Sequence, residues 1–102
     1  MAETAWHDVA ALTDIDEETG LAVRVDEEAI ALFLVAGTVR AVEDFCPHQG
    51  SPLSGALTRD GIVTCPLHAW QFRLDDGTNV DDGPGLRTFS VRQRDGRIEI
   101  EV

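Results

Sequence analysis

The sequence is poor in basic residues and contains no long apolar run. Acidic residues outnumber Lys and Arg by 19 to 8, which gives a formal charge of -11 at pH 7. Such a surface repels phosphate backbones and anionic lipids but attracts basic protein surfaces, so we expect no nucleic-acid partner. The longest apolar run, residues 29–36, is too short to cross a bilayer. Residues 1–8 show no pattern of a secretory signal or transit peptide, and we therefore expect a cytoplasmic protein that does not associate with a membrane.

Cysteine is also scarce, because the chain has only two. Two cysteines exclude a disulfide framework, and in a reducing compartment they are more often metal ligands or core residues. With 102 residues, 43% of them hydrophobic and 26% charged, the chain has the composition of one folded domain. We expect a single domain over residues 1–102, with little room for a separate substrate-binding domain.

Turn signals divide the chain into short segments of β type. Short stretches that contain Gly, Pro, Asn or Asp recur between runs that are rich in branched or aromatic residues. This pattern predicts an all-β, antiparallel sandwich or small barrel. The expected strands cover residues 21–25, 29–35, 38–42, 62–64, 70–74, 88–92 and 97–102. Residues 9–18 alone suggest a helical turn.

The end of the chain shows the strand pattern well. Apolar and charged side chains alternate over residues 97–102, which predicts a strand with one face buried. Asp95-Gly96 precedes it, and Asp60-Gly61 has the same composition. Both pairs favour tight hairpins, because Gly accepts the positive φ that these turns require.

Two segments, residues 44–54 and 65–69, break the strand pattern, and each carries one cysteine and one histidine. These are Cys46-Pro47-His48 and Cys65-Pro66-Leu67-His68, separated by 16 residues. Loops of this kind within a β scaffold are where chemistry is usually found. Two thiolates and two imidazoles are the ligand set of a Rieske centre, in which two His replace two Cys on one iron.

Three other interpretations of these residues are open. Two cysteines can be inert core residues. A Cys₂His₂ set also suits structural zinc, although zinc motifs usually place two to four residues between paired ligands and Cys46 and His48 have one between them. A Cys/His nucleophile pair would leave the second pair unexplained.

Over longer stretches, the two segments resemble the Rieske ferredoxin family. The resemblance rests on Cys46-Pro47-His48-Gln49-Gly50-Ser51-Pro52-Leu53-Ser54-Gly55 and on Cys65-Pro66-Leu67-His68-Ala69-Trp70-Gln71-Phe72, and it extends from about residue 6 to the C-terminus. It implies an antiparallel Rieske-type sandwich or barrel in which two loops form an inserted cluster-binding subdomain, at about residues 44–73. It also implies one [2Fe–2S] cluster, with Cys46 and Cys65 on one iron and His48 and His68 on the outer iron.

The resemblance to this family implies that the protein is an electron carrier rather than an enzyme. The expected partners are a flavin-dependent NAD(P)H reductase and a terminal oxygenase, of a dioxygenase or monooxygenase system. The alternative is the small Rieske subunit of an NAD(P)H-dependent nitrite reductase, with the large subunit as partner. A second alternative, from a different functional class, is an interaction module that is stabilised by zinc.

The sequence departs from respiratory Rieske proteins at four positions. Ser51 and Leu67 stand where those relatives have a pair of disulfide-forming cysteines, and Trp70 and Phe72 stand where they have Ser and Tyr hydroxyls. In the relatives, these hydroxyls donate hydrogen bonds to sulfur, which stabilises the reduced state. We therefore expect a potential in the lower part of the Rieske range of roughly −150 to +300 mV.

Overall fold

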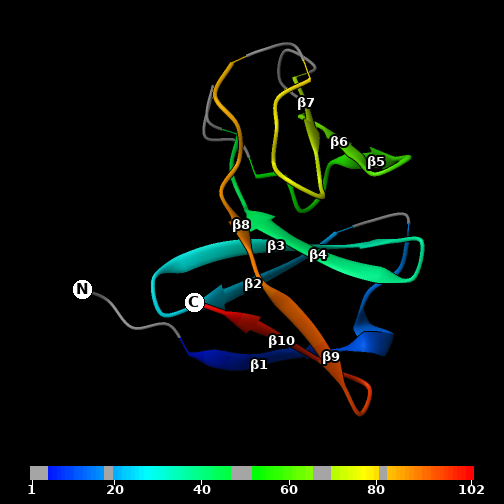
Figure 1. Ribbon diagram of the computed structural model, residues 1–102, viewed down its shortest axis with the longest axis vertical. Helices are drawn as coiled ribbons and strands as arrows, with labels where there is room; N and C mark the ends of the chain where they lie inside the picture. The colour runs from blue at the N-terminus through cyan, green and yellow to red at the C-terminus, as the bar shows by residue number, and fades with distance from the viewer. Residues whose placement is uncertain (1–4, 18–19, 47–51, 66–69, 81–82) are drawn as a thin grey trace.

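The computed structural model describes residues 5–17, 20–46, 52–65, 70–80 and 83–102 (Figure 1). Nearly all regular structure in these ranges is antiparallel β, which confirms the predicted fold class. The elements are β1 (Trp6–Ala11), the 3-10 turn η1 (Leu12–Asp14), β2 (Leu21–Val25), β3 (Glu28–Val35), β4 (Thr38–Glu43), β5 (Leu57–Arg59), β6 (Ile62–Thr64), β7 (Gln71–Arg73), β8 (Thr88–Phe89), β9 (Val91–Arg94) and β10 (Arg97–Glu101).

The strands form three sheets. The outer sheet has the order β1-β10-β9, the middle sheet β2-β3-β4-β8 and the small sheet β5-β6-β7. In Figure 1 the middle sheet lies between the other two, with β1, β9 and β10 below it and the small sheet above it. All strand pairs are antiparallel, and short hairpin connections join β2 to β3, β3 to β4, β5 to β6, β6 to β7 and β9 to β10.

The middle sheet is buried on both faces, and β3 shows this most directly. Successive side chains of a strand point to opposite faces. Ile30 and Leu32 enter one hydrophobic core, and Ala31 and Phe33 enter another. We call the first the lower core (Ala10, Ile15, Val25, Ile30, Leu32, Val39, Ala41, Ile98 and Ile100) and the second the upper core (Ala31, Phe33, Val42, Cys46, Leu53, Ala56, Val63, Cys65, Phe72, Leu74 and Leu86). Burial on both faces explains why β3 is a continuous apolar run.

The two expected hairpins are present. Asp60 and Gly61 have φ of 53° and 77°, and Asp95 and Gly96 have φ of 50° and 76°. Two consecutive residues with positive φ fit the right-handed twist of the flanking strands. These turns join β5 to β6 and β9 to β10. The alternation predicted for the last strand is confirmed as well, because Ile98 and Ile100 are fully buried.

The expected helical turn in residues 9–18 is wrong for its first part. Residues up to Ala11 belong to β1, and only Leu12–Asp14 forms a 3-10 turn. β1 pairs with β10, and its register shifts between Asp8 and Ala10. This shift breaks the simple alternation by which a strand is recognised, and a partner about 90 positions away supplies the pairing.

Two further differences from the sequence-based expectation concern strands. The single strand expected over residues 88–92 is two strands, because β8 pairs with β4 in the middle sheet and β9 pairs with β10 in the outer sheet. The chain therefore changes sheets near Ser90. β5 was not predicted from the sequence.

Candidate metal centre

Both cysteines lie in the upper core. Cys46 comes shortly after β4 of the middle sheet, and Cys65 comes directly after β6 of the small sheet. Both are fully buried and pack in the same group of residues as Phe72. Neither of these two cysteines, which are both within the described residues, forms a disulfide. Strands of two different sheets thus bring two thiols into one apolar environment.

The first cysteine lies in a stretch that Asp44 closes. We call residues 45–52 the first segment. The Oδ1 atom of Asp44 accepts hydrogen bonds from the backbone N–H of Leu53, at 2.8 Å, and of Ser54, at 2.7 Å. The first segment therefore ends close to where it begins. Sequence reasoning missed Asp44, although short acidic side chains that bind nearby backbone N–H groups are common where chains turn.

The second cysteine begins a shorter stretch, which the backbone closes. We call residues 66–69 the second segment. The N–H of Cys65 donates to the carbonyl oxygen of Trp70 at 2.7 Å. This bond follows directly on the pair Thr64 and Gln71 in the β6–β7 ladder. The second segment is thus the connection of an antiparallel hairpin.

Trp70 is a packing residue. Its side chain is partly buried and packs against the upper core. Its ring centroid lies 6.3 Å from that of Phe72, with the planes tilted by 53°. This distance is within the range of favourable aromatic pairs.

The chain after β7 folds back against that strand. The N–H of Val80 donates to the carbonyl oxygen of Gln71 at 2.9 Å, and the N–H of Leu86 donates to that of Gly77 at 2.7 Å. A Cβ atom on Gly77 would lie 2.2 Å from the Leu86 oxygen, and the φ of Gly77 is +77°. Only glycine fits this close approach. The sequence indicated turns here but not that they support the strand next to the second segment.

Arg87 fixes the end of β4, immediately before Asp44. Its N–H donates to Oε1 of Glu43 at 3.1 Å, and its carbonyl oxygen accepts the N–H of Glu43 at 2.9 Å. Its guanidinium also pairs with Glu28 at 3.1 Å and lies 4.7 Å from the ring centroid of Phe89. These contacts join β3, β4 and β8 at the point where the first segment begins.

The structure brings together half of the predicted ligand set. Cys46 and Cys65 share the upper core, while His48 and His68 lie outside the described residues. For this reason, the described ranges contain no group of three or more residues of metal-binding type. Two buried thiols, each at the start of a segment that carries a histidine, fit a centre with two sulfur and two nitrogen ligands. The complete set of four remains a prediction.

The comparison with protein families decides the class of this centre. The family model described as the Rieske [2Fe–2S] domain matches residues 5–93. The chain belongs to the Rieske [2Fe–2S] domain family. Its cofactor is a [2Fe–2S] cluster, so the zinc interpretation is set aside.

Relatives of this Rieske chain include complete ferredoxins. It is 32% identical to the ferredoxin component of the alkene monooxygenase system of Xanthobacter autotrophicus, over 91% of this chain and 78% of the relative. It is 34% identical to the terminal oxygenase component of carbazole 1,9a-dioxygenase from Sphingomonas sp., over 95% of this chain. The chain spans only 29% of the length of that oxygenase component.

Among solved structures, this Rieske chain is similar to a protein assigned as the NADH-dependent nitrite reductase small subunit of Mycobacterium tuberculosis. The TM-score is 0.88 and the identity 27%, over 99% of this chain and 97% of the other. The expected Rieske-type fold is therefore confirmed. In the part of the chain that the structure describes, no helix has the length and hydropathy needed to cross a membrane.

Proposed function

We propose that this Rieske protein is a one-electron carrier in which Cys46 and Cys65 hold one iron and His48 and His68 hold the other. The observation that carries the proposal is the pair of fully buried cysteines, supplied by two sheets to one core. When bound, the cluster accepts and releases a single electron. The cluster-binding subdomain would comprise about residues 44–73 of a single domain, 1–102.

The residues of the chain have three tasks in this function. The upper core keeps water from the two thiolates, the closures at Asp44 and Cys65 fix the ends of the two segments, and the histidines replace two thiolates by neutral ligands. Fewer negative charges around the irons make the added electron easier to accept. No bound substrate is required for any of these tasks, so the protein acts as a component of a larger oxidoreductase.

The partners proposed are a flavin-dependent NAD(P)H reductase, as electron donor, and a terminal oxygenase, as acceptor, in the cytoplasm. The alkene monooxygenase ferredoxin component supports this assignment, because the likeness covers most of both chains. The second candidate function is that of the small subunit of an NAD(P)H-dependent nitrite reductase. The similarity in fold and length to the Mycobacterium tuberculosis protein supports it.

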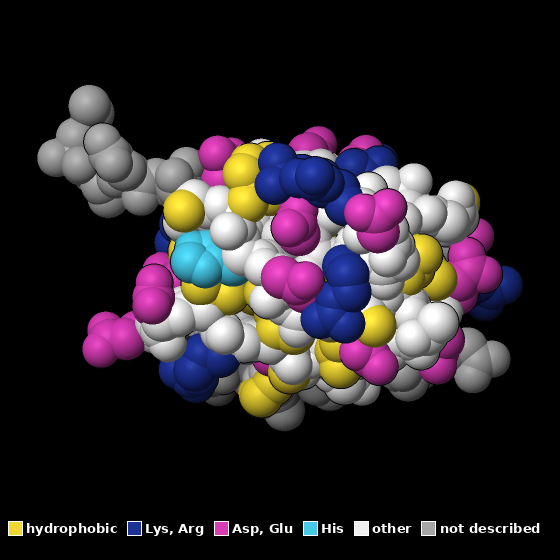
Figure 2. All heavy atoms as spheres, turned by 90° about the horizontal axis from the view of Figure 1, so that it is seen from below, with side chains coloured by type: hydrophobic (Ala, Val, Ile, Leu, Met, Phe, Trp, Pro, Cys, Tyr) yellow, Lys and Arg dark blue, Asp and Glu magenta, His cyan; other side chains and the backbone are white. Residues whose placement is uncertain are grey.

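Charge is distributed unevenly, in a way that suits docking through the two segments. Apart from the ligands, residues 45–52 and 66–69 contain no Asp, Glu, Lys or Arg, and Phe45, next to Cys46, is 45% exposed. By contrast, Figure 2 shows acidic and basic side chains side by side on the face seen from below. An uncharged surface approaches a partner without the cost of burying charge, while the net charge of -11 steers the protein towards a basic recess.

The ligand assignment is tested by metal analysis. We expect about two irons and two acid-labile sulfides per chain. Cys46→Ser, Cys65→Ser, His48→Ala and His68→Ala should each lose most of both. The third histidine provides the control, because His7 lies on β1 in the outer sheet, and His7→Ala should keep the full content. Stoichiometric zinc, or a cluster retained in the cysteine variants, would refute the assignment.

The carrier role is tested by stopped-flow reduction of the protein with candidate reductases at increasing ionic strength. The rate should fall with salt, since charges more than about 8 to 10 Å apart become screened. Leu67→Asp, outside the described residues, should slow the reaction even at high salt. A rate that does not fall with salt, together with an unimpaired Leu67→Asp variant, would contradict this mode of docking.

A further inference from the structure

The first segment joins two sheets, and for this reason its ends are not held by a strand ladder. It follows β4 in the middle sheet and leads to β5 in the small sheet, and these two strands do not pair. Among the residues that the structure describes, its ends are joined by the hydrogen bonds from Leu53 and Ser54 to the Asp44 carboxylate, at 2.8 and 2.7 Å. A single oxygen atom thus takes the place of a ladder.

Asp44 itself is anchored in the middle sheet. Its backbone N–H donates to the carbonyl oxygen of Ala29 at 3.0 Å, one position beyond the last pair of the β3–β4 ladder. The preceding residue, Glu43, is held by two hydrogen bonds to the backbone of Arg87, one donated by the Glu43 N–H and one accepted by its side-chain carboxylate. The carboxylate therefore starts from a fixed point of the scaffold.

The other end of the first segment is held by packing. Leu53 is fully buried in the upper core. The carbonyl oxygen of Ser54 lies 2.7 Å from the place that a Cβ atom on Gly20 would occupy, so the chain before β2 lies directly against it. The N–H groups of Leu53 and Ser54, from which Asp44 accepts hydrogen bonds, are partly buried, and such groups are costly to leave without an acceptor.

We propose that Asp44 is a positioning residue for the cluster, which holds the two ends of the first segment together and thereby keeps Cys46 in the core that it shares with Cys65. The proposal rests on the ligand assignment made above. Asp44 acts through the backbone of Leu53 and Ser54 and does not need to touch the cluster. Its effect is to slow the separation of Asp44 from Leu53 and Ser54, and so the loss of iron from the folded protein.

The test compares variants that differ at the acceptor atom. Asp44→Ala removes the acceptor, whereas Asp44→Asn keeps a carbonyl oxygen that can accept both bonds. The matched control is Asp76→Ala, because Asp76 Oδ1 also accepts a backbone N–H, that of Thr78 at 2.9 Å, in an exposed turn without predicted ligands. Ile98→Val, in the lower core, shows how iron loss depends on a small decrease in global stability.

Two measurements are made on the holoproteins. The first is the rate at which iron is lost to an excess of a chelator, followed by the visible absorption of the cluster. We expect Asp44→Ala to lose iron at least about tenfold faster than the wild type, because two partly buried N–H groups lose a charged acceptor. Asp44→Asn should restore a rate near that of the wild type, and Asp76→Ala and Ile98→Val should change it much less.

The second measurement is residue-resolved hydrogen exchange by mass spectrometry. In the wild type, the amides of Leu53 and Ser54 should exchange at least about tenfold more slowly than in an unfolded peptide, and Asp44→Ala should remove this protection. If Asp44→Ala does not fold, the proposal is still tested by the wild-type exchange rates and by the rate of iron loss from Asp44→Asn. Fast exchange of these amides in the wild type would overturn the proposal, as would equal iron loss in Asp44→Ala and Asp76→Ala or in Asp44→Ala and Asp44→Asn.

The outcome separates this proposal from the ligand assignment. If Cys46→Ser kept its cluster, the ligand assignment would fail, even with slow exchange at Leu53 and Ser54. If Cys46→Ser lost the cluster and those two amides exchanged rapidly in the wild type, the ligands would stand and the role of Asp44 would fail.

Discussion

A buried cysteine lies at the start of each segment, because Cys46 is the second residue of the first segment and Cys65 directly precedes the second, but the two segments are closed by different means. The second segment lies between β6 and β7, which pair with each other, so a backbone hydrogen bond from Cys65 to Trp70 closes it. The first segment lies between β4 and β5, which belong to different sheets, and the side chain of Asp44 closes it. One closure follows from the fold, and the other depends on the identity of one residue.

This difference predicts how each segment fails. A backbone hydrogen bond is not removed by truncating a side chain, so the second segment should open only when β6 and β7 separate. The closure of the first segment can be lost while the sheets stay intact. Local opening with a free energy below that of global unfolding is common for such regions.

The largest effect on stability is expected for Phe72→Ala, which tests the second segment. Phe72 is fully buried on β7, opposite Val63 of β6. Its truncation should lower the free energy of unfolding by about 3–5 kcal/mol, measured by urea denaturation of the holoprotein. Iron loss and unfolding should occur in the same transition. Separate transitions would show that the second segment can also open locally.

A smaller effect on stability is expected for Gly20→Ala, which tests the first segment through a residue that contacts its end but does not belong to it. The new Cβ would lie 2.6 Å from Cε1 of Phe33 and 2.7 Å from the carbonyl oxygen of Ser54. Overpacking of this kind costs about 1–3 kcal/mol and should accelerate iron loss. Gly55→Ala is the control, because a Cβ there has no atom within 4 Å. Similar behaviour of the two variants would contradict the packing of Ser54 against Gly20.

The redox potential provides a third comparison. We expect a wild-type midpoint below zero at neutral pH, because Trp70 and Phe72 supply no hydroxyl to the cysteine sulfurs. Phe72 lies in the same core as both cysteines. Phe72→Tyr should raise the midpoint in voltammetry if the new hydroxyl reaches a sulfur. A clearly positive wild-type value would refute the argument from missing donors.

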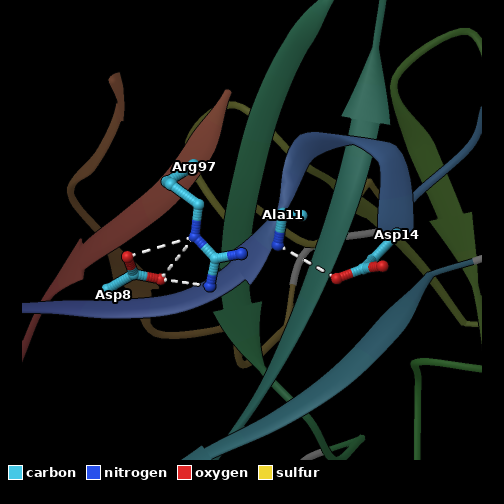
Figure 3. A network of polar contacts seen from close by, with 4 residues as sticks. All are labelled: Asp8, Ala11, Asp14 and Arg97. Atoms are coloured by element: carbon cyan, nitrogen blue, oxygen red, sulfur yellow. Dashed lines mark hydrogen bonds and ion pairs between the residues drawn. The ribbon is translucent and has the colours of Figure 1, made fainter. Parts of the chain in front are cut away.

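The smallest effect is expected far from both segments, at the pair of Asp8 and Arg97 (Figure 3). The Arg97 guanidinium donates to Asp8 from Nη2, at 2.7 Å, and from Nε, and these hydrogen bonds lower the pKa of Asp8. The resulting stabilisation is complete above the unfolded pKa of about 3.9 and is lost as pH falls through the lower folded pKa.

Asp8→Asn should therefore make the free energy of unfolding fall slightly less steeply as the pH is lowered, as measured by urea titrations from pH 5 downwards. At high salt the difference from the wild type should shrink, since both side chains are about half exposed and the pair is screened. Iron loss at neutral pH should not change. A large effect of Asp8→Asn on iron loss would show that the outer sheet and the two segments are coupled.

What the sequence could predict depends on the range of the interactions involved. The alternation at Ile98 and Ile100 and the turns at Asp60-Gly61 and Asp95-Gly96 are local, and the structure confirms them. The Cys and His spacing predicted the family, because a cluster demands specific donor types at close spacing.

The missed features depend on residues far apart in the chain. β1 is stabilised by pairing with β10 and includes an irregularity at Asp8 and Ala10, so its own pattern is weak. The role of Asp44 depends on the return of the chain at Leu53 and Ser54, which no local pattern of charge or hydropathy reveals. For the candidate site, the sequence indicated the ligands but not the group that holds their segment in place.

The double burial of the middle sheet limits how this protein can be re-engineered. The predicted cluster-binding subdomain, about residues 44–73, draws much of its core from outside itself, since Ala31, Phe33 and Val42 come from the middle sheet. A graft of that stretch alone onto another protein would leave its apolar side open to water. The cluster-binding subdomain should therefore not fold when it is transferred alone, and a graft must include at least β3 and β4.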